Sequence, residues 1–369
     1  MIARIRIAMT LAVLVSGAAL RAERLDRENL LIYRIDGDRT AAVKTPADWQ
    51  KRRAEIVAGM QSVMGPLPGA EKRVPLDVTV VSETDCGSFV RREILYTAEP
   101  GGRVPAFLLI PKVVLQGQAT RPGILALMPT NDTEGNRPVV GLQSPTAKPN
   151  RNYGEELAQR GFVVLAPPYP HLFTYKPDLK GLGYRSGTMK AIWDNIRGLD
   201  VLAATPGVST AGFGAVGHSL GGHNSIYTAV FDARIKAIVS SCGFDSYLDY
   251  YAEKQATVWR PGQGWTQDRY MPALADYAGR LKEIPFDFHE LIGALAPRAF
   301  LALSPTGDAN FKWQSVDRVI AAARPVYQLH GVADRIAVEH PDCQHDFPPE
   351  MREKAYQWVE RFLNQSAAR

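Results

Sequence analysis

The sequence predicts an α/β protein with a mixed, mainly parallel sheet flanked by helices, and three observations indicate it. From about residue 120, short apolar runs alternate with amphipathic stretches. Continuous apolar runs are typical of strands buried on both faces, as in a parallel sheet covered by helices. Before residue 120 the chain holds alternating, β-branched runs, which indicate antiparallel strands. A chain of 369 residues, 46% hydrophobic and 22% charged, can bury such a core.

The first 22 residues have the features of a cleaved export signal. Arg4 and Arg6 form a basic region, residues 7–15 an apolar one, and small residues follow at 16–19 and at Ala22. The apolar run is shorter than the roughly 20 residues that span a bilayer, which favours a signal over a membrane anchor. We therefore expect a periplasmic or secreted protein that does not associate with a membrane after signal cleavage.

Charge and cysteine content exclude several classes of function. The formal charge is +5, and subtracting the three arginines of residues 1–22 leaves +2. So small and evenly spread a charge predicts no nucleic-acid partner. Cys86, Cys242 and Cys343 lack the spacing of a metal or haem site. We expect each to be a small buried residue, and the sequence cannot choose a disulfide pair.

Residues 23–75 are expected to form an N-terminal helical extension. Residues 23–45 lack periodicity and are expected to wrap the surface. Thr45 can cap a helix that begins at Pro46 and runs to about Met64, where Gly65 and a proline end it. The main domain, residues 76–369, begins with strands at 76–82, 88–97 and 103–110, the last two joined by a turn at 100–102.

The parallel part of the sheet follows in order along the chain. Strands are expected at 124–128, 162–166, up to 216, 235–239, 299–303 and 334–338, with helices at 188–205, 220–231, 313–323 and 348–364. Residues 167–187 and 243–296 interrupt this alternation. The second interruption holds ten aromatic residues, and we expect it to form a cap-like insertion over the site.

Gly217-His218-Ser219-Leu220-Gly221 matches the G-x-S-x-G pattern of a nucleophile elbow. It lies between a buried strand and an apolar helix, which is the context that such an elbow requires. A side chain at either glycine would collide within so tight a turn. We interpret Ser219 as the nucleophile; the alternative is a glycine-rich turn with no chemistry.

A serine hydroxyl needs a base, and in folds with this elbow the acid and the histidine follow the serine along the chain. His345 is the histidine that falls in a loop between the last strand and the final helix. His223 lies within the helix after the serine and would point away. We therefore expect His345 to be the base.

The acid should follow a strand between the serine and the histidine. Asp308 is the first carboxylate after the strand 299–303 and would hold the imidazole and stabilise its charged form. Asp245 follows the preceding strand and is the main rival. Asp317 is expected to face solvent, and Asp346 adjoins His345 too closely to fold back onto its ring.

Two backbone donors are needed for the oxyanion that forms during acyl transfer. The amide of Leu220 is one. The other should come from the loop after the strand 124–128, where Pro129 has no N–H and leaves Thr130 or Asn131. We favour Asn131.

These motifs resemble bacterial α/β-hydrolases of the dienelactone-hydrolase and acetyl-xylan-esterase type. The resemblance covers roughly 75–365. It is carried by the elbow, by 193–200, by 286–291 with 296–298, and by Cys343-Gln344-His345-Asp346-Phe347; the same segments are similar to glucuronoyl esterases. It implies the α/β-hydrolase fold and ester hydrolysis through an acyl-serine, with no metal or organic cofactor.

Three departures limit what the resemblance carries over. Dienelactone hydrolases use a cysteine nucleophile, so their lactone activity does not transfer to Ser219. Pro129-Thr130 replaces the usual His-Gly of the oxyanion loop. Glucuronoyl esterases usually have an arginine directly after the serine, and Leu220 at that position argues against a glucuronate ester.

The sequence thus predicts a serine esterase for a small acyl or carbohydrate ester. One alternative is a peptidase that resembles prolyl oligopeptidases. Those enzymes carry a large β-propeller before the catalytic domain, and the roughly 100 residues before the parallel strands are too few for one. The other is a non-catalytic binding protein of the same fold. The insertion is expected to set substrate choice without taking part in bond breaking. Trp259 and Trp265 flank a Pro-Gly-Gln-Gly turn, so one or both are expected at a loop tip near the pocket mouth; the alternative is that they are buried in the insertion's own core and serve stability. The oligomeric state is not predicted.

Overall fold

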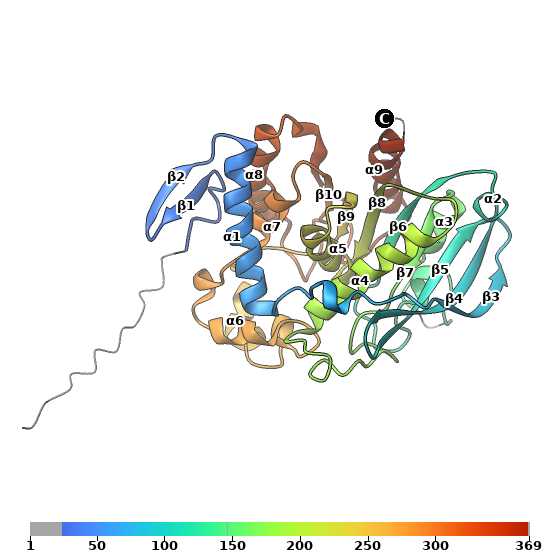
Figure 1. Cartoon of the computed structure of the whole chain (residues 1–369). Coiled ribbons are helices and arrows are strands. Elements are labelled where there is room, and N and C mark those ends of the chain that lie inside the picture. Colours follow the sequence, from blue (N-terminus) through green and yellow to red (C-terminus); the bar gives the residue numbers. More distant parts are fainter. Residues whose placement is uncertain (1–23, 146, 368–369) are drawn as a thin grey trace, which may run out of the picture.

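The computed structural model describes residues 24–145 and 147–367. The predicted export signal, residues 1–22, lies outside this range. The described chain forms a nine-stranded sheet in the order β11-β10-β9-β8-β6-β7-β5-β4-β3 and a separate two-stranded hairpin (Figure 1). None of the helices described is long and apolar enough to cross a membrane.

The large sheet is antiparallel at one end and parallel over the rest. β3, β4 and β5 pair antiparallel with their neighbours, and β5 pairs antiparallel with β7. From β7 to β11 all pairs are parallel. The predicted mixed, mainly parallel sheet is therefore confirmed. Its strands are β3 Thr79–Asp85, β4 Phe89–Glu99, β5 Gly102–Pro111, β6 Arg121–Leu127, β7 Val163–Ala166, β8 Val208–His218, β9 Ile235–Ser241, β10 Ala299–Leu303 and β11 Ile336–Glu339.

Helices cover both faces of this sheet. Gly123 and Ile124 are neighbours on β6 and face opposite sides of the sheet. A Cβ atom added at Gly123 would contact Leu202 of α4. Ile124 pairs with Gly214 of β8, where an added Cβ atom would contact Leu363 of α9, so α4 and α9 cover opposite faces. α4 and α5 contact each other, and α3 and α9 are joined by the Glu156–Arg352 ion pair. These helices are α3 Tyr153–Gln159, α4 Gly187–Ala204, α5 Leu220–Phe231, α8 Trp313–Leu329 and α9 Pro349–Ala367.

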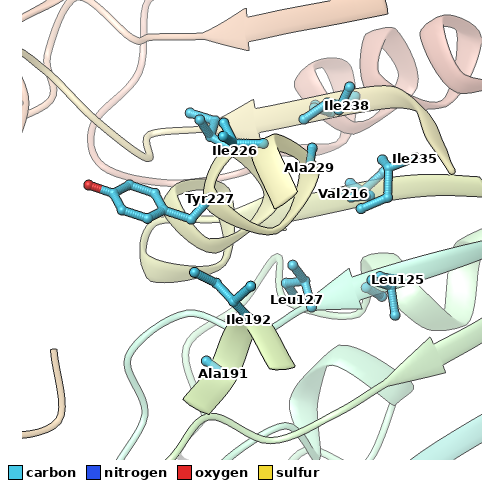
Figure 2. Close-up of a cluster of buried hydrophobic side chains, with 14 of the residues drawn as sticks. Leu125, Leu127, Ala191, Ile192, Val216, Ile226, Tyr227, Ala229, Ile235 and Ile238 are labelled. Atoms are coloured by element: carbon cyan, nitrogen blue, oxygen red, sulfur yellow. The ribbon is translucent and has the colours of Figure 1, made fainter. Parts of the chain in front are cut away.

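The core between α4, α5 and the sheet is apolar and closed to solvent. Figure 2 shows Ile226 and Ala229 of α5 and Ile192 of α4 beside strand residues such as Leu127 and Val216. All five are at most 2% exposed. Burying a valine, leucine or isoleucine side chain stabilises the fold by roughly 1.5–3 kcal/mol, so this packing fixes α5 and its first residues on the sheet.

The N-terminal extension contains α1, Pro46–Met64, and the hairpin β1–β2 (Ile32–Asp36 and Arg39–Ala42). The predicted helix is confirmed, with the Thr45 side chain accepting from the Asp48 amide. The hairpin replaces the irregular wrapping expected for 23–45. α1 packs against the hairpin and against α7, Phe288–Leu295, as Figure 1 shows.

The insertion 243–296 has little regular structure before α7. It contains α6 Gln255–Val258 and several short 3-10 turns. Aromatic side chains fill its interior, and most are at most 8% exposed. Because short turns bury little backbone, the position of this insertion depends on ring packing against α5. α2, Lys112–Leu115, completes the helices of the described chain.

Candidate active site

Ser219 lies at the end of β8 in a conformation that side chains rarely adopt. Its φ is 55° and its ψ −121°, and the next residue begins α5. The Ser219 amide donates to the Ser241 carbonyl of β9 at 2.8 Å. Strain of this kind persists only where the surroundings impose it, and it is found at functional sites. The turn places Ser219 just beyond the carboxyl end of β8, a central strand of the sheet.

The two glycines of the motif are required by close backbone contact. A Cβ atom at Gly217 would lie 2.2 Å from the carbonyl carbon of Gly221. A Cβ atom at Gly221 would lie 1.8 Å from the Leu127 oxygen at the end of β6. Gly222 likewise lies against Ser240 of β9. The elbow therefore lets α5 start directly against two neighbouring strands.

The structure brings Ser219, His345 and Asp308 together. His345 Nε2 lies 3.0 Å from Ser219 Oγ, and His345 Nδ1 lies 2.9 and 3.0 Å from the two Asp308 oxygens. The Asp308 side chain is 1% exposed and the His345 side chain 21%. Asp308 Oδ1 also accepts from the amide of Asn310 at 2.7 Å, which fixes the carboxylate. This is the geometry of a serine–histidine–acid relay.

The rival carboxylates are engaged elsewhere. Asp245 is buried and accepts from the Lys312 amide at 3.2 Å, and burial raises its pKa well above the ordinary value. Asp317 binds Nε2 of His340 at 2.9 Å. Asp346 pairs with Arg151, which draws it away from the ring of the neighbouring histidine.

The loop that carries His345 is held by residues at the end of the loop after β6 and by Cys242. Arg151 and Asn150 both bind the carboxylate of Asp346, Asn150 at 2.6 Å. The Cys242 thiol donates to the Asp346 carbonyl at 3.4 Å. The sequence analysis did not predict these contacts to Asp346. The signal available to it was the acid directly after the predicted base, with an Asn-Arg pair in the loop after β6.

Two other histidines near the site are buried and neutral. Burial lowers the pKa of His223 to about 3, and its ring stacks on Tyr227 and Trp265 with centroids 4.2 and 4.1 Å apart. Burial, with the Arg151 and Lys148 cations, lowers the pKa of His218 well below its usual range. His218 Nδ1 lies 3.1 Å from Ser241 Oγ. His223 points into the insertion, in agreement with the sequence interpretation.

The loop after β6 lies beside Ser219, where the second oxyanion donor was sought. The Asn131 side chain accepts from Thr133 and from the Glu134 amide at 2.9 Å, so it is turned into its own loop. Its backbone N–H has no recorded partner among the described residues and stays the proposed second donor. Leu220 is the first residue of α5, and the first amides of a helix have no partner within it.

A cavity of about 320 Å³ opens at Ser219 and His345. Its size is at the low end of small-molecule sites. Most of its wall comes from the loop after β6, and the residues that line it include no leucine, isoleucine or methionine. These are Pro129, Thr130, Asn131, Asp132, Thr133, Glu134, Gly135, Pro138, Val139, Ala147, Lys148, Arg151, His218, Ser219 and His345.

The two tryptophans expected near the pocket mouth lie inside the insertion instead. Trp259 is 1% exposed and packs edge-on against Tyr247. Trp265 is 6% exposed and stacks on His223. Neither lines the cavity at Ser219. The expected position near the pocket mouth is wrong for both, and the alternative of burial in the insertion's own core holds. Flat apolar rings in a segment of short turns bury against each other, because no long helix is there to supply a core.

The cysteines are all free thiols; Cys242 is buried, while Cys86 and Cys343 are half-buried, which corrects the expectation of full burial for those two. Cys242 Sγ, an Asp308 oxygen and a His345 nitrogen lie within 4.8 Å of one another. Three such atoms can in principle hold a metal ion. Here the Asp308–His345 hydrogen bond already uses two of them, and burial raises the pKa of the thiol well above its usual range.

Comparison with known proteins relates the chain to glucuronoyl esterases. A family model described as "Glucuronyl esterase, fungi" matches residues 178–331. A 4-O-methyl-glucuronoyl methylesterase 1 of Sodiomyces alcalophilus is 27% identical over 42% of this chain and 34% of its own length. One of Wolfiporia cocos is 25% identical over 88% and 79%. The glucuronoyl esterase structure of Solibacter usitatus superposes with a TM-score of 0.70 at 19% identity, covering 90% of this chain and 97% of that one.

The chain has the α/β-hydrolase fold and resembles glucuronoyl esterases. The predicted fold class and the predicted resemblance are therefore confirmed. The chain spans 34% and 43% of the lengths of two of the relatives that it matches, those of Sodiomyces alcalophilus and Hypocrea jecorina. What these glucuronoyl-esterase relatives act on bears on this chain only as support for a proposal.

Proposed function

We propose that the chain is a serine esterase that hydrolyses a carbohydrate ester through an acyl-serine intermediate. The observation that carries the proposal is the hydrogen-bonded line from Ser219 through His345 to Asp308. A serine held in a strained turn beside a histidine, with that histidine oriented by a buried carboxylate, is arranged for nucleophilic attack on a carbonyl.

The steps follow from the positions of the three side chains. Ser219 Oγ attacks the ester carbonyl while His345 Nε2 takes its proton. Asp308 keeps the Nδ1–H tautomer and stabilises the imidazolium. The backbone amides of Leu220 and Asn131 bind the oxyanion, the alcohol leaves with the proton from His345, and a water repeats the sequence on the acyl-enzyme.

Two observations support a carbohydrate ester over a long-chain ester. The cavity at Ser219 is small, and most of the residues that line it are polar or charged. The proteins that the chain resembles are named as glucuronoyl esterases. The Leu220 side chain is 2% exposed and supplies no cation to the cavity, so it remains an argument against a glucuronate ester. Methyl glucuronate esters and acetylated sugars are therefore the first substrates to compare. We further propose export to the periplasm or the medium, where polysaccharide esters are met.

Labelling with a fluorophosphonate probe, combined with a panel of esters, tests the proposal. We expect the parent protein to be labelled and Ser219→Ala to be unlabelled, with turnover of the best ester reduced about 10⁴-fold or more. Ser225→Ala is the matched control, because Ser225 lies six residues after Ser219 on α5 and donates to the Gly221 carbonyl at 2.8 Å. An unlabelled parent protein would support a binding protein instead, and a parent that cleaves peptides but no ester would support the peptidase alternative.

A further inference from the structure

The insertion 243–296 contacts the loop after β6 on both sides of Asn131. Tyr270 Oη lies 3.0 Å from Thr130 Oγ1. Arg269 Nη1 donates to both oxygens of Asp132, at 2.9 and 3.1 Å. Two consecutive residues of the insertion therefore bind the two neighbours of the proposed second oxyanion donor.

Other contacts of this loop lie further along the chain. Asn136 donates to the Ala166 carbonyl at 2.7 Å, and the Ser144 amide donates to Glu134 at 2.9 Å. These bonds hold Glu134 and Asn136, which follow Asn131 by three and five residues. Residues 130–132 thus receive their recorded side-chain contacts to other segments from Arg269 and Tyr270.

Tyr270 is itself fixed. Its side chain is 6% exposed, its ring lies 5.2 Å from Trp265 and 5.9 Å from Tyr169, and its carbonyl accepts from the Thr188 amide of α4. The backbone before it passes so close to α4 that a Cβ atom at Gly187 would lie 2.2 Å from the Arg269 oxygen. The hydroxyl of Tyr270 therefore cannot shift without the surrounding rings.

The same rings connect Tyr270 with the other oxyanion donor. Trp265 stacks on His223, which lies one turn after Ser219 on α5. A continuous series of contacts thus runs from α5, which carries the Leu220 amide, through His223, Trp265 and Tyr270 to Thr130. His223 has no hydrogen-bond partner at either ring nitrogen among the described residues, and it takes part through its flat face.

We propose that Tyr270 is a positioning residue for the oxyanion hole: through Thr130 it sets the distance between the Asn131 and Leu220 amides. The inference rests on the proposed esterase function. Oxyanion donors act only when they lie within hydrogen-bond distance of the developing charge, and loss of one donor costs about 10²–10³-fold in turnover. A donor that is present but free to move should lose a part of this effect.

Tyr270→Phe tests the inference because it keeps the ring and removes only the contact to Thr130. We expect kcat to fall about tenfold with KM little changed and with the melting temperature preserved. Thr130→Val should reproduce the loss and Thr130→Ser should not, and the double variant Tyr270→Phe/Thr130→Val should be no worse than either single one. Thr130 is exposed, so its variants do not endanger folding.

A thiono ester gives a readout that a structural role would not change. Sulfur in place of the carbonyl oxygen bonds poorly to the oxyanion donors, so the parent should prefer the oxygen ester strongly, and Tyr270→Phe should prefer it less. Tyr247→Phe is the matched control, since Tyr247 of the insertion also loses a hydroxyl contact, to Tyr227 of α5. It should lower the melting temperature and leave the oxygen-to-sulfur preference unchanged.

The inference is overturned if Tyr270→Phe keeps kcat within twofold of the parent, or if its oxygen-to-sulfur preference equals that of the parent. Failure of the esterase proposal looks different: Ser219→Ala would then retain the parental turnover. An inactive Ser219→Ala beside a fully active Tyr270→Phe rejects the role of Tyr270 alone.

Discussion

Asp308 and Asp245 show how far a single residue can be assigned from sequence. Both follow a buried strand, and position along the chain favoured Asp308 without excluding its rival. In the structure Asp308 accepts from His345 and from the amide of Asn310, whereas Asp245 accepts from the amide of Lys312. The deciding contacts come from neighbouring loops whose path the sequence pattern does not specify.

Asp308→Asn should reduce turnover of the best ester by about 10³–10⁴-fold, because the amide no longer holds the Nδ1–H tautomer or stabilises the imidazolium. Asp245→Asn is the control: an asparagine oxygen can still accept from the Lys312 amide, and kcat should stay within a few-fold of the parent. Steady-state kinetics on both variants check this. The reverse order of effects would assign the acid to Asp245.

At the scale of elements, the spacing of apolar residues and the positions of capping residues, glycines and prolines were sufficient to predict the sheet and the long helices. α1, α4 and α5 begin within one residue of their expected starts. The hairpin β1–β2 was missed, although its turn carries an Asp-Gly pair at 36–37, a strong hairpin signal. Its strands are short, half-exposed and charged, so they lack a clear alternation.

The bounds of the insertion could be predicted from the sequence, but its internal structure could not. Its elements are single turns, and ring packing against α5 decides which of its aromatic residues face inward. Trp259 and Trp265 were therefore placed near the pocket mouth when both are buried. The sequence led us to expect no part for the insertion in bond breaking, whereas the role proposed above for Tyr270 would give it one through Thr130.

The interface between α5 and the insertion should weaken in acid. His223 has an ordinary pKa of 6.5 that burial lowers to about 3 in the folded chain. Between these values the unfolded chain binds a proton that the folded chain cannot bind. Stability therefore falls as pH decreases through this window, by about 1.4 kcal/mol per pH unit, and is unaffected by this group above pH 6.5.

His223→Phe keeps a flat ring between Tyr227 and Trp265 and removes the titration. The difference in unfolding free energy between pH 7 and pH 4.5 should shrink by roughly 2.5 kcal/mol relative to the parent. Urea unfolding at the two pH values measures it. His218 titrates in the same direction in both proteins, so its effect cancels in the comparison. An unchanged difference would mean that His223 is protonated in the folded state.

At the scale of the whole molecule, a short arm at residues 24–28 ties the start of the described chain to the insertion. Arg27 donates to Asp287 at 2.5 Å and to the Lys282 carbonyl at 2.9 Å. Arg24 and Arg52 both bind Glu290. Asp287 and Glu290 are at most 1% exposed, and Asp287 also caps α7. The arm thus supplies the counter-charge of Asp287 and shares that of Glu290 with Arg52 of α1.

Arg27→Met should lower the free energy of unfolding by roughly 3 kcal/mol, because removing one partner of a buried ion pair leaves the other without compensation. Arg39→Met is the control, since Arg39 pairs with Asp36 on the surface, where both side chains are more than 70% exposed. That change should stay within about 0.5 kcal/mol. Urea unfolding of the two variants provides the comparison, and equal losses would show that the arm is not a stabilising element.

The position of this arm also bears on how the chain is made. Arg27 and Asp287 are 260 residues apart in sequence. During synthesis from the N-terminus, the arm and α1 exist long before α7, and for most of that time Arg24 and Arg27 lack the carboxylates that they bind in the finished chain. Chains that stop before residue 287 keep this defect permanently. Such fragments are the species that chaperones retain and proteases remove, so the ion pairs that secure the finished molecule also distinguish it from an unfinished one.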